Sequence, residues 1–173
     1  MNLPRYREIM MQTGAFLLIE EPDGEIRTGW AAFDTTLPRK AMRAPGLLPE
    51  LAGRLERFFK GDAIDFSDVP LPEGSPFHRA CWAAARKIPR GSSITYAQLA
   101  AAAGSAKATR AAGQAMRRNP QPILTPCHRV VASNGRLGGF AGDTREDEQG
   151  IRTKRLLLQL EAPSGSTAMI PIS

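Results

Sequence analysis

The chain has 173 residues, enough for one domain or two small ones with a buried core, and its hydrophobic content of 42% is typical of globular proteins. No apolar run approaches the length of a membrane span, and the charged start of the chain is unlike a signal peptide. We therefore expect no membrane association and a location in the cytoplasm, or in the nucleus if the source is a eukaryote. With two cysteines and two histidines, a metal site would need both Cys127 and His128, so we expect reduced thiols and no metal.

The net charge of +6 is unevenly distributed along the chain. Residues 74–142 contain ten lysines and arginines and no Asp or Glu, whereas the residues before 74 carry nine basic and twelve acidic groups. A basic segment of this kind favours contact with a polyanion, because phosphate contacts supply most non-specific affinity for nucleic acids. A solvated basic surface without such a partner explains the charge equally well.

Residues 1–73 predict a small N-terminal α/β domain and a linker. Residues 13–20 and 26–33 are two apolar runs around a Pro-Asp-Gly turn, which indicates a hairpin in a short antiparallel sheet. Residues 50–59 place apolar side chains on one stripe of a helix. Residues 62–74 are rich in Pro and acidic groups and lack periodicity, so we place the domain boundary there.

Residues 74–163 predict a mainly helical second domain, followed by a loose tail at 164–173, which makes the fold class α+β. Ser75 and Pro76 suit the start of a helix that runs over residues 77–88. Cys81 lies on the apolar stripe of that helix. We therefore expect it to be a buried, inert thiol.

A helix-turn-helix is expected next. Thr95 and Gln98 fit a capping box, which predicts a helix from Tyr96 to Ala103; Gly104 would end it, and Ser105 would cap a second helix over residues 106–117. That second helix is rich in alanine and glycine, and a slim helix suits the minor groove of DNA, which is ~6 Å wide. Helix pairs of this kind also occur in proteins that never bind DNA, and the alanines could equally serve close packing.

The pentapeptide Pro126-Cys127-His128-Arg129-Val130 places a thiol beside an imidazole. Only the thiolate attacks, so the cysteine needs a base or cation, which His128, Arg129 or a helix N-terminus could supply. Successive side chains of an extended chain point to opposite faces, so His128 reaches Cys127 only across a turn or through a water molecule. For a bare Cys-His pair, a buried structural cysteine beside a surface histidine is the commoner interpretation.

The pentapeptide resembles the active-site signature of the O6-alkylguanine-DNA alkyltransferases, the methylated-DNA–protein-cysteine methyltransferases. The resemblance covers about residues 75–162 and includes these further segments in the family's order: Ile94–Ala100, Lys107–Gly113, Asn119-Pro120, Leu137–Gly142, and Leu156–Leu158 with Glu161. It implies DNA repair by irreversible, single-turnover transfer of an alkyl group from O6-alkylguanine in duplex DNA, with O4-alkylthymine as an open alternative substrate. It further implies no cofactor, binding through the minor groove, and a monomer for which cooperative assembly on DNA is left open.

The resemblance also implies catalytic roles, carried over by position. Cys127 would accept the alkyl group, and His128 would draw off the thiol proton through a water molecule while Glu161 holds the other ring nitrogen. Tyr96 would help to rotate the target nucleotide and would hydrogen-bond near the base. Asn119 would tie the helix-turn-helix to the active-site loop.

Other positions would contact DNA or the alkylated base. Arg110 would enter the base stack in place of the extruded nucleotide. Phe140 would stack on the alkylated base and Ala141 would contact it; many relatives have Tyr and some have Ser at these two positions, but stacking needs only the aromatic face. Further DNA contacts are expected from a set of residues on the helix-turn-helix: Thr95, Ala111, Gly113 and Arg117.

Two further features are a residue that departs from the family's pattern and an extra segment before the family's last motif. Thr125 stands where Ile or Val is usual, and its hydroxyl has no role that the sequence reveals. An extra charged stretch spans residues 143–150, within an insertion that reaches 153, and we expect a solvated loop that points away from DNA. A closing helix is expected over residues 154–161, with its leucines inward: Leu156, Leu157 and Leu160.

Three alternatives stay open. A protein that binds alkylated DNA without transfer is one, although such relatives lack a cysteine at the position of Cys127. A Cys-His hydrolase would need an oxyanion hole, and a transcriptional regulator would leave the Cys-His loop unexplained. Only the transferase would gain the alkyl group from DNA, and only once per molecule.

Overall fold

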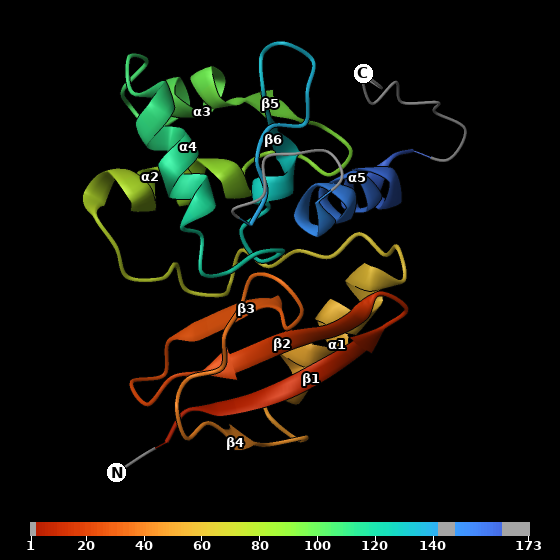
Figure 1. Ribbon diagram of the computed structural model, residues 1–173. Helices are drawn as coiled ribbons and strands as arrows, with labels where there is room; N and C mark the ends of the chain where they lie inside the picture. The colour runs from red at the N-terminus through yellow and green to blue at the C-terminus, as the bar shows by residue number, and fades with distance from the viewer. Residues whose placement is uncertain (1–2, 142–147, 164–173) are drawn as a thin grey trace.

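The computed structural model describes residues 3–141 and 148–163, so the expected tail and most of the charged stretch lie outside the described residues. The chain forms two halves that lie against each other, one built on a four-stranded sheet and one mainly helical (Figure 1). The expected α+β fold class is confirmed. None of the helices within the described ranges is both long and apolar enough to cross a bilayer.

The sheet of the N-terminal half has the strand order β3-β2-β1-β4, with β4 parallel to β1 and the other pairs antiparallel. Its strands are β1 (Arg5–Met11), β2 (Gly14–Glu20), β3 (Ile26–Trp30) and β4 (Met42–Arg43). The expected hairpin is confirmed as β2–β3, but β3 ends at Trp30 and not at residue 33. The reason is a turn: the carbonyl of Trp30 accepts hydrogen bonds from the amides of Phe33, Asp34 and Thr35.

Helix α1 (Pro49–Phe59) packs against this sheet (Figure 1). Phe16 of β2 lies edge-to-face with Phe59, their ring centroids 5.0 Å apart. Leu55 and Phe58 are buried in the same apolar core. Full burial of each such side chain contributes about 1.5–3 kcal/mol relative to exposure, so this packing stabilises the N-terminal half.

The C-terminal half contains the helix-turn-helix and a two-stranded parallel sheet formed by β5 and β6. Its elements are α2 (Pro76–Arg86), β5 (Ile94–Thr95), α3 (Tyr96–Ala102), α4 (Thr109–Arg117), the short 3₁₀ helix η1 (Cys127–Arg129), β6 (Val130–Val131) and α5 (Gln149–Glu161). The caps predicted at Ser75 and at Thr95 with Gln98 are confirmed. Ser75 accepts the amide of His78, and both hydrogen bonds of the capping box between Thr95 and Gln98 are present. Cys81 is buried, as expected.

The second helix of the helix-turn-helix begins at Thr109, and the prediction that it begins at residue 106 is wrong. Ser105 does not cap it: the carbonyl of Ser105 accepts the amide of Ala108 at 2.9 Å, which closes a separate turn before the helix. Gly104 ends the first helix as expected, with a left-handed φ of 91° that a side chain would disfavour. The slim helix is therefore shorter than predicted.

Helix α5 begins at Gln149, five residues before the predicted start, and its inward face also differs from the prediction. Leu156 was expected to point inward but is 52% exposed, while Lys154 is fully buried. With 3.6 residues per turn, Ile151, Lys154 and Leu157 fall on one side of the helix, and that side faces the protein. A lysine thus occupies a core position.

Polar side chains join the two halves behind the loop of residues 119–126. Thr28 of β3 donates through its hydroxyl to the carbonyl of Pro122 at 2.7 Å. Arg86 of α2 donates to the hydroxyl of Thr125 at 3.0 Å, to the side-chain oxygen of Gln121 at 2.7 Å and to the carbonyl of Val69. Gln121 in turn donates to the carbonyl of Ile26 at 2.7 Å. Arg86 therefore links α2, the segment between the halves and the loop.

Replacing Arg86 by Leu should lower the free energy of unfolding by about 3 kcal/mol, because it leaves several buried acceptors without a donor. Urea denaturation measures the effect. Lys87→Leu is the matched control, since Lys87 carries the same charge at the next position and is exposed. Equal losses in the two variants would show that Arg86 does not stabilise the junction.

Candidate active site

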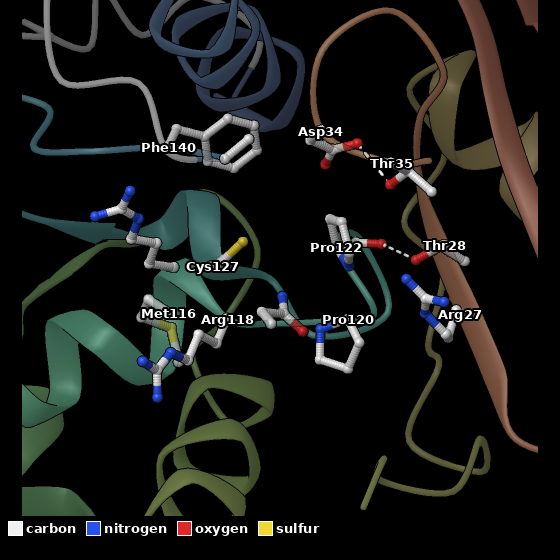
Figure 2. Close-up of a pocket in the computed structure, with 13 residues that line it drawn as sticks. Arg27, Thr28, Asp34, Thr35, Met116, Arg118, Pro120, Pro122, Cys127 and Phe140 are labelled. Carbon is white, nitrogen blue, oxygen red and sulfur yellow. Dashed lines mark hydrogen bonds between the residues drawn. The ribbon is translucent and has the colours of Figure 1, made fainter. Parts of the chain in front are cut away.

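The side chain of Cys127 points into a cavity of about 380 Å³ between the two halves (Figure 2). The cavity is lined by β3 and its following turn, by the C-terminal end of α4, by the 119–126 loop and by the glycine-rich segment near residue 140. Five residues predicted from the sequence meet there: Cys127, Asn119, Arg117, Phe140 and Ala141. Cys127 is 8% exposed, so its sulfur is sheltered but reachable.

Hydrogen bonds of Asn119 fix the loop that carries Cys127. Its side-chain amide donates to the carbonyl of Thr125 at 2.9 Å, and its side-chain oxygen accepts the amide of Gln121 at 3.0 Å. Asn119 follows directly after the C-cap of α4, so it connects the helix-turn-helix to the Cys127 loop. The Thr125 hydroxyl, which had no role in the sequence, is the acceptor for Arg86 on the far side of the loop.

The Cys127 thiol is poorly solvated. Burial raises its pKa, while a hydrogen bond from Asn119 and the positive charge of Lys154 act in the opposite direction. The negative charge of Asp34 raises the pKa further. The two side chains that act to lower the thiol pKa are therefore Asn119 and Lys154.

His128, the residue next to Cys127, forms a buried pair with Glu161. Nε2 of His128 lies 3.1 Å from Oε1 of Glu161, and neither side chain is exposed. Burial lowers the pKa of His128 more than Glu161 raises it, so the imidazole is neutral at neutral pH. Within the described residues, neither ring nitrogen makes a hydrogen bond of regular geometry: Nε2 has only its close polar contact with Glu161, and Nδ1 has no partner. A neutral ring held through Nε2 leaves Nδ1 as a proton acceptor.

Arg129 completes this pair. It donates to both carboxylate oxygens of Glu161, at 2.9 and 2.7 Å, and to the carbonyl of Ile88 at 2.6 Å. Burial alone would raise the pKa of Glu161, but the hydrogen bonds from His128 and Arg129 outweigh it and lower the pKa to about 2. Glu161 therefore stays charged and holds the imidazole in one orientation.

Lys154 is a site residue that was not predicted from the sequence. Its ammonium donates to the carbonyls of Val130 at 2.6 Å and Gly139 at 3.1 Å, and it lies 5.8 Å from the centre of the Tyr96 ring. Burial lowers its pKa to about 8, against the opposing effect of Cys127. The signal was available: Lys154 interrupts an apolar stripe of α5.

Tyr96 is half-buried beside the same carbonyl. Its hydroxyl donates to Gly139 at 3.3 Å. Burial, and secondarily the charge of Cys127, raises the pKa of Tyr96 to about 12, so the hydroxyl keeps its proton and remains a donor. Gly138 makes room for the ring, because a Cβ there would lie 2.9 Å from it.

The expected base-stacking residue lies at the cavity edge (Figure 2). The Phe140 ring packs edge-to-face on Trp30, with ring centroids 5.5 Å apart. Ala141 follows in a left-handed conformation, with φ of 50°. The N-terminal half thus supports the aromatic ring from behind.

The expected DNA-contacting residues lie mainly on α4, outside the cavity except for Arg117. Arg110, Ala111 and Arg117 are exposed. Gly113 is half-buried, and a Cβ there would lie 4.0 Å from the Tyr96 ring. Thr95 is half-buried at the cap of α3. In the described part of the chain, no three His, Cys, Asp or Glu side chains are arranged to hold a metal ion.

Comparison with known proteins adds the following matches. The family model described as the DNA binding domain of 6-O-methylguanine DNA methyltransferase matches residues 76–163. The constitutive methylated-DNA–protein-cysteine methyltransferase of Bacillus subtilis is 38% identical over 154 residues, which cover 86% of this chain and 89% of that protein. The crystal structure of Mycobacterium tuberculosis O6-methylguanine methyltransferase is similar with a TM-score of 0.77 and 31% identity, over 96% of each chain. A structure of Mycobacterium tuberculosis OGT in complex with DNA has the same TM-score, with 32% identity over 92% of this chain and 96% of that one.

Replacing Lys154 by Met should slow the reaction of Cys127 with iodoacetamide at pH 7 several-fold. Loss of the nearby cation removes an effect that lowers the thiol pKa, so the thiolate fraction falls. The modification rate of Cys127, followed by peptide mapping against pH, measures this, and the rate profile should move to higher pH. Arg152→Met is the control, since Arg152 is an exposed cation of the same helix. A profile that stays in place would rule out Lys154 as a stabiliser of the thiolate.

Proposed function

The chain belongs to the methylated-DNA–protein-cysteine methyltransferases, and from this premise we propose that it repairs O6-alkylguanine in duplex DNA by moving the alkyl group to Cys127. One observation carries the assignment of Cys127: its sulfur opens into a cavity lined partly by the end of α4. At about 380 Å³, the cavity lies within the range of roughly 300–1,000 Å³ that is typical of small-molecule sites. One extruded base is an occupant of suitable size.

Activation of the thiol would begin at Nδ1 of the neutral His128 ring. We propose that Nδ1 takes the thiol proton through a water molecule, while Glu161 holds Nε2 and stabilises the imidazolium that forms. The Lys154 charge favours the thiolate at the moment when it forms. The high thiol pKa keeps Cys127 protonated until then, so activation depends on the base.

Transfer would be a displacement at the first carbon of the alkyl group. The sulfur of Cys127 forms a bond to that carbon, the bond from carbon to O6 breaks, and its electron pair stays on the guanine oxygen. The guanine takes up one proton at N1, which balances the proton lost by the thiol. Tyr96 remains protonated near this site and is our candidate donor of a hydrogen bond to the base.

The product would be a thioether on Cys127. A thioether has no hydrolysable acyl bond and no good leaving group, so each protein molecule would act once. The alternative of a protein that binds alkylated DNA without transfer is less well supported, because a reachable cysteine occupies the cavity. No additional cofactor is needed for this chemistry.

DNA would be contacted through α4. Its exposed face carries Arg110 and Arg117 between small residues, which suits the minor groove. Arg110 would fill the space that the extruded nucleotide leaves. The cavity begins at the C-terminal end of the same helix, about 10 Å along its axis from Arg110, so one surface could serve extrusion and capture.

Cys127→Ala should abolish transfer of a labelled methyl group from DNA to the protein and leave the affinity for duplex DNA within about threefold, because the only part of the DNA that would reach the sulfur is the extruded base. Gel shift measures affinity, and counting label in the protein measures transfer. Cys81→Ala is the matched control, and it should retain transfer since Cys81 is buried in the core. Label in the Cys127→Ala protein would assign the reaction to another residue.

Arg110→Ala should slow repair of duplex DNA by about ten- to a hundredfold, because extrusion of a base costs a few kcal/mol that this side chain would offset. Reaction with free O6-methylguanine base requires no extrusion and should change less than about threefold. Arg39→Ala serves as a control for the loss of an exposed cation in the N-terminal half. Equal losses on duplex and free base would remove the proposed role.

A further inference from the structure

The N-terminal half forms one wall of the Cys127 cavity, and the proposed transfer mechanism assigns no role to the residues of this wall. Arg27 and Thr28 of β3 line it, together with Asp34 and Thr35 of the turn that follows (Figure 2). The end of α4 lines another part of the cavity. If DNA lies against α4, an extruded base enters the cavity from that side, and the edge of the base farthest from the sugar approaches the wall formed by the N-terminal half. O6 and its alkyl group belong to that edge, since N9 carries the sugar at the opposite end of a purine.

Asp34 is the acidic residue of this wall, and the described residues provide no Lys or Arg partner for it. Its Oδ1 accepts hydrogen bonds from the amide of Trp30 and, at 2.7 Å, from the hydroxyl of Thr35. Arg27, the basic residue on the same wall, is paired with Glu21 at 2.9 Å. Burial raises the pKa of Asp34 to about 6 against these hydrogen bonds, so the carboxylate is poorly hydrated yet mainly charged at neutral pH.

The backbone fixes the position of Asp34 before any substrate arrives. Three successive amides of the turn converge on the carbonyl of Trp30. Gly29 makes this arrangement possible: a Cβ there would lie 1.6 Å from Oγ1 of Thr35 and 2.7 Å from Oδ1 of Asp34. The wall is therefore preformed and cannot easily move away from an incoming group.

We propose that Asp34 is a specificity-determining residue that admits neutral alkyl groups to Cys127 and disfavours alkyl groups that carry a negative charge. The inference rests on the proposed function. A group in transfer must lie between O6 and the sulfur, in the same small cavity as the carboxylate. Two like charges in the same small cavity repel each other, so Asp34 lowers the affinity for an anionic adduct, against the attraction of Arg117 and Arg118 in the same lining, and leaves a methyl group unaffected.

The experiment compares two duplex substrates of the same shape, O6-carboxymethylguanine, which is anionic, and O6-carbamoylmethylguanine, its neutral counterpart. Single-turnover rate constants are measured for the wild-type protein and for Asp34→Asn, which keeps the size of the side chain. The ratio of the neutral to the anionic rate constant should fall on the order of tenfold in Asp34→Asn, since the variant removes the repulsion. Comparing this ratio between the two proteins cancels the intrinsic difference in reactivity of the adducts, which is the same for both.

Three controls sharpen the result. Asp34→Glu keeps the charge and should keep the wild-type ratio within about threefold, and Glu25→Gln removes an acidic group that does not line the cavity and should do the same. Asp34→Ala also removes the charge and should lower the ratio in the same direction, which provides a second test if Asp34→Asn folds poorly.

An unchanged ratio in Asp34→Asn, with intact transfer from O6-methylguanine, would overturn the role of Asp34 and leave the proposed function standing. Failure of the wild-type protein to accept any methyl group from O6-methylguanine DNA would instead count against the proposed function itself. Whether the methyl group is transferred therefore shows which of the two proposals has failed, the role of Asp34 or the proposed function.

Discussion

The site depends on one buried carboxylate. Glu161, at the end of α5, accepts hydrogen bonds from Nε and Nη2 of Arg129, and its Oε1 lies 3.1 Å from Nε2 of His128. Burying a charge costs several kcal/mol unless partners offset it, and here the partners are consecutive residues of the η1 turn that begins with Cys127. Arg129 also binds the carbonyl that follows α2. The carboxylate therefore fixes the turn, orients the imidazole and connects three elements that are distant in sequence.

The N-terminal half takes part in the site directly. β3 binds the 119–126 loop through Thr28, its Trp30 supports Phe140, and the turn after it places Asp34 at the cavity. The C-terminal half supplies the sulfur and the helix that we propose meets DNA. The cavity exists only where the two halves meet, so the reaction of Cys127 and its choice of substrate are coupled to the packing between them.

Much of this could be predicted from the sequence, because caps and short motifs are local signals. Each of these signals involves residues only a few positions apart: the cap at Ser75, the capping box of Thr95 and Gln98, and the Pro-Cys-His pattern. The contributions of Arg86 and Asp34 could not be predicted, since each depends on residues far along the chain, whereas Lys154 was missed although it interrupts an apolar stripe. The role of the Thr125 hydroxyl could not be predicted either, because this hydroxyl accepts a hydrogen bond from Arg86, a residue 39 positions away. The start of α4 was misplaced because a turn outcompeted the expected cap.

The most direct test of the account is the mass of the intact wild-type protein after incubation with excess duplex DNA that contains O6-methylguanine, followed by peptide mapping. The account predicts that each molecule gains one methyl group, that the methyl is on Cys127, and that further substrate adds nothing. Methylation at Cys81 or any other residue, or release of methylated product with repeated turnover, would contradict it.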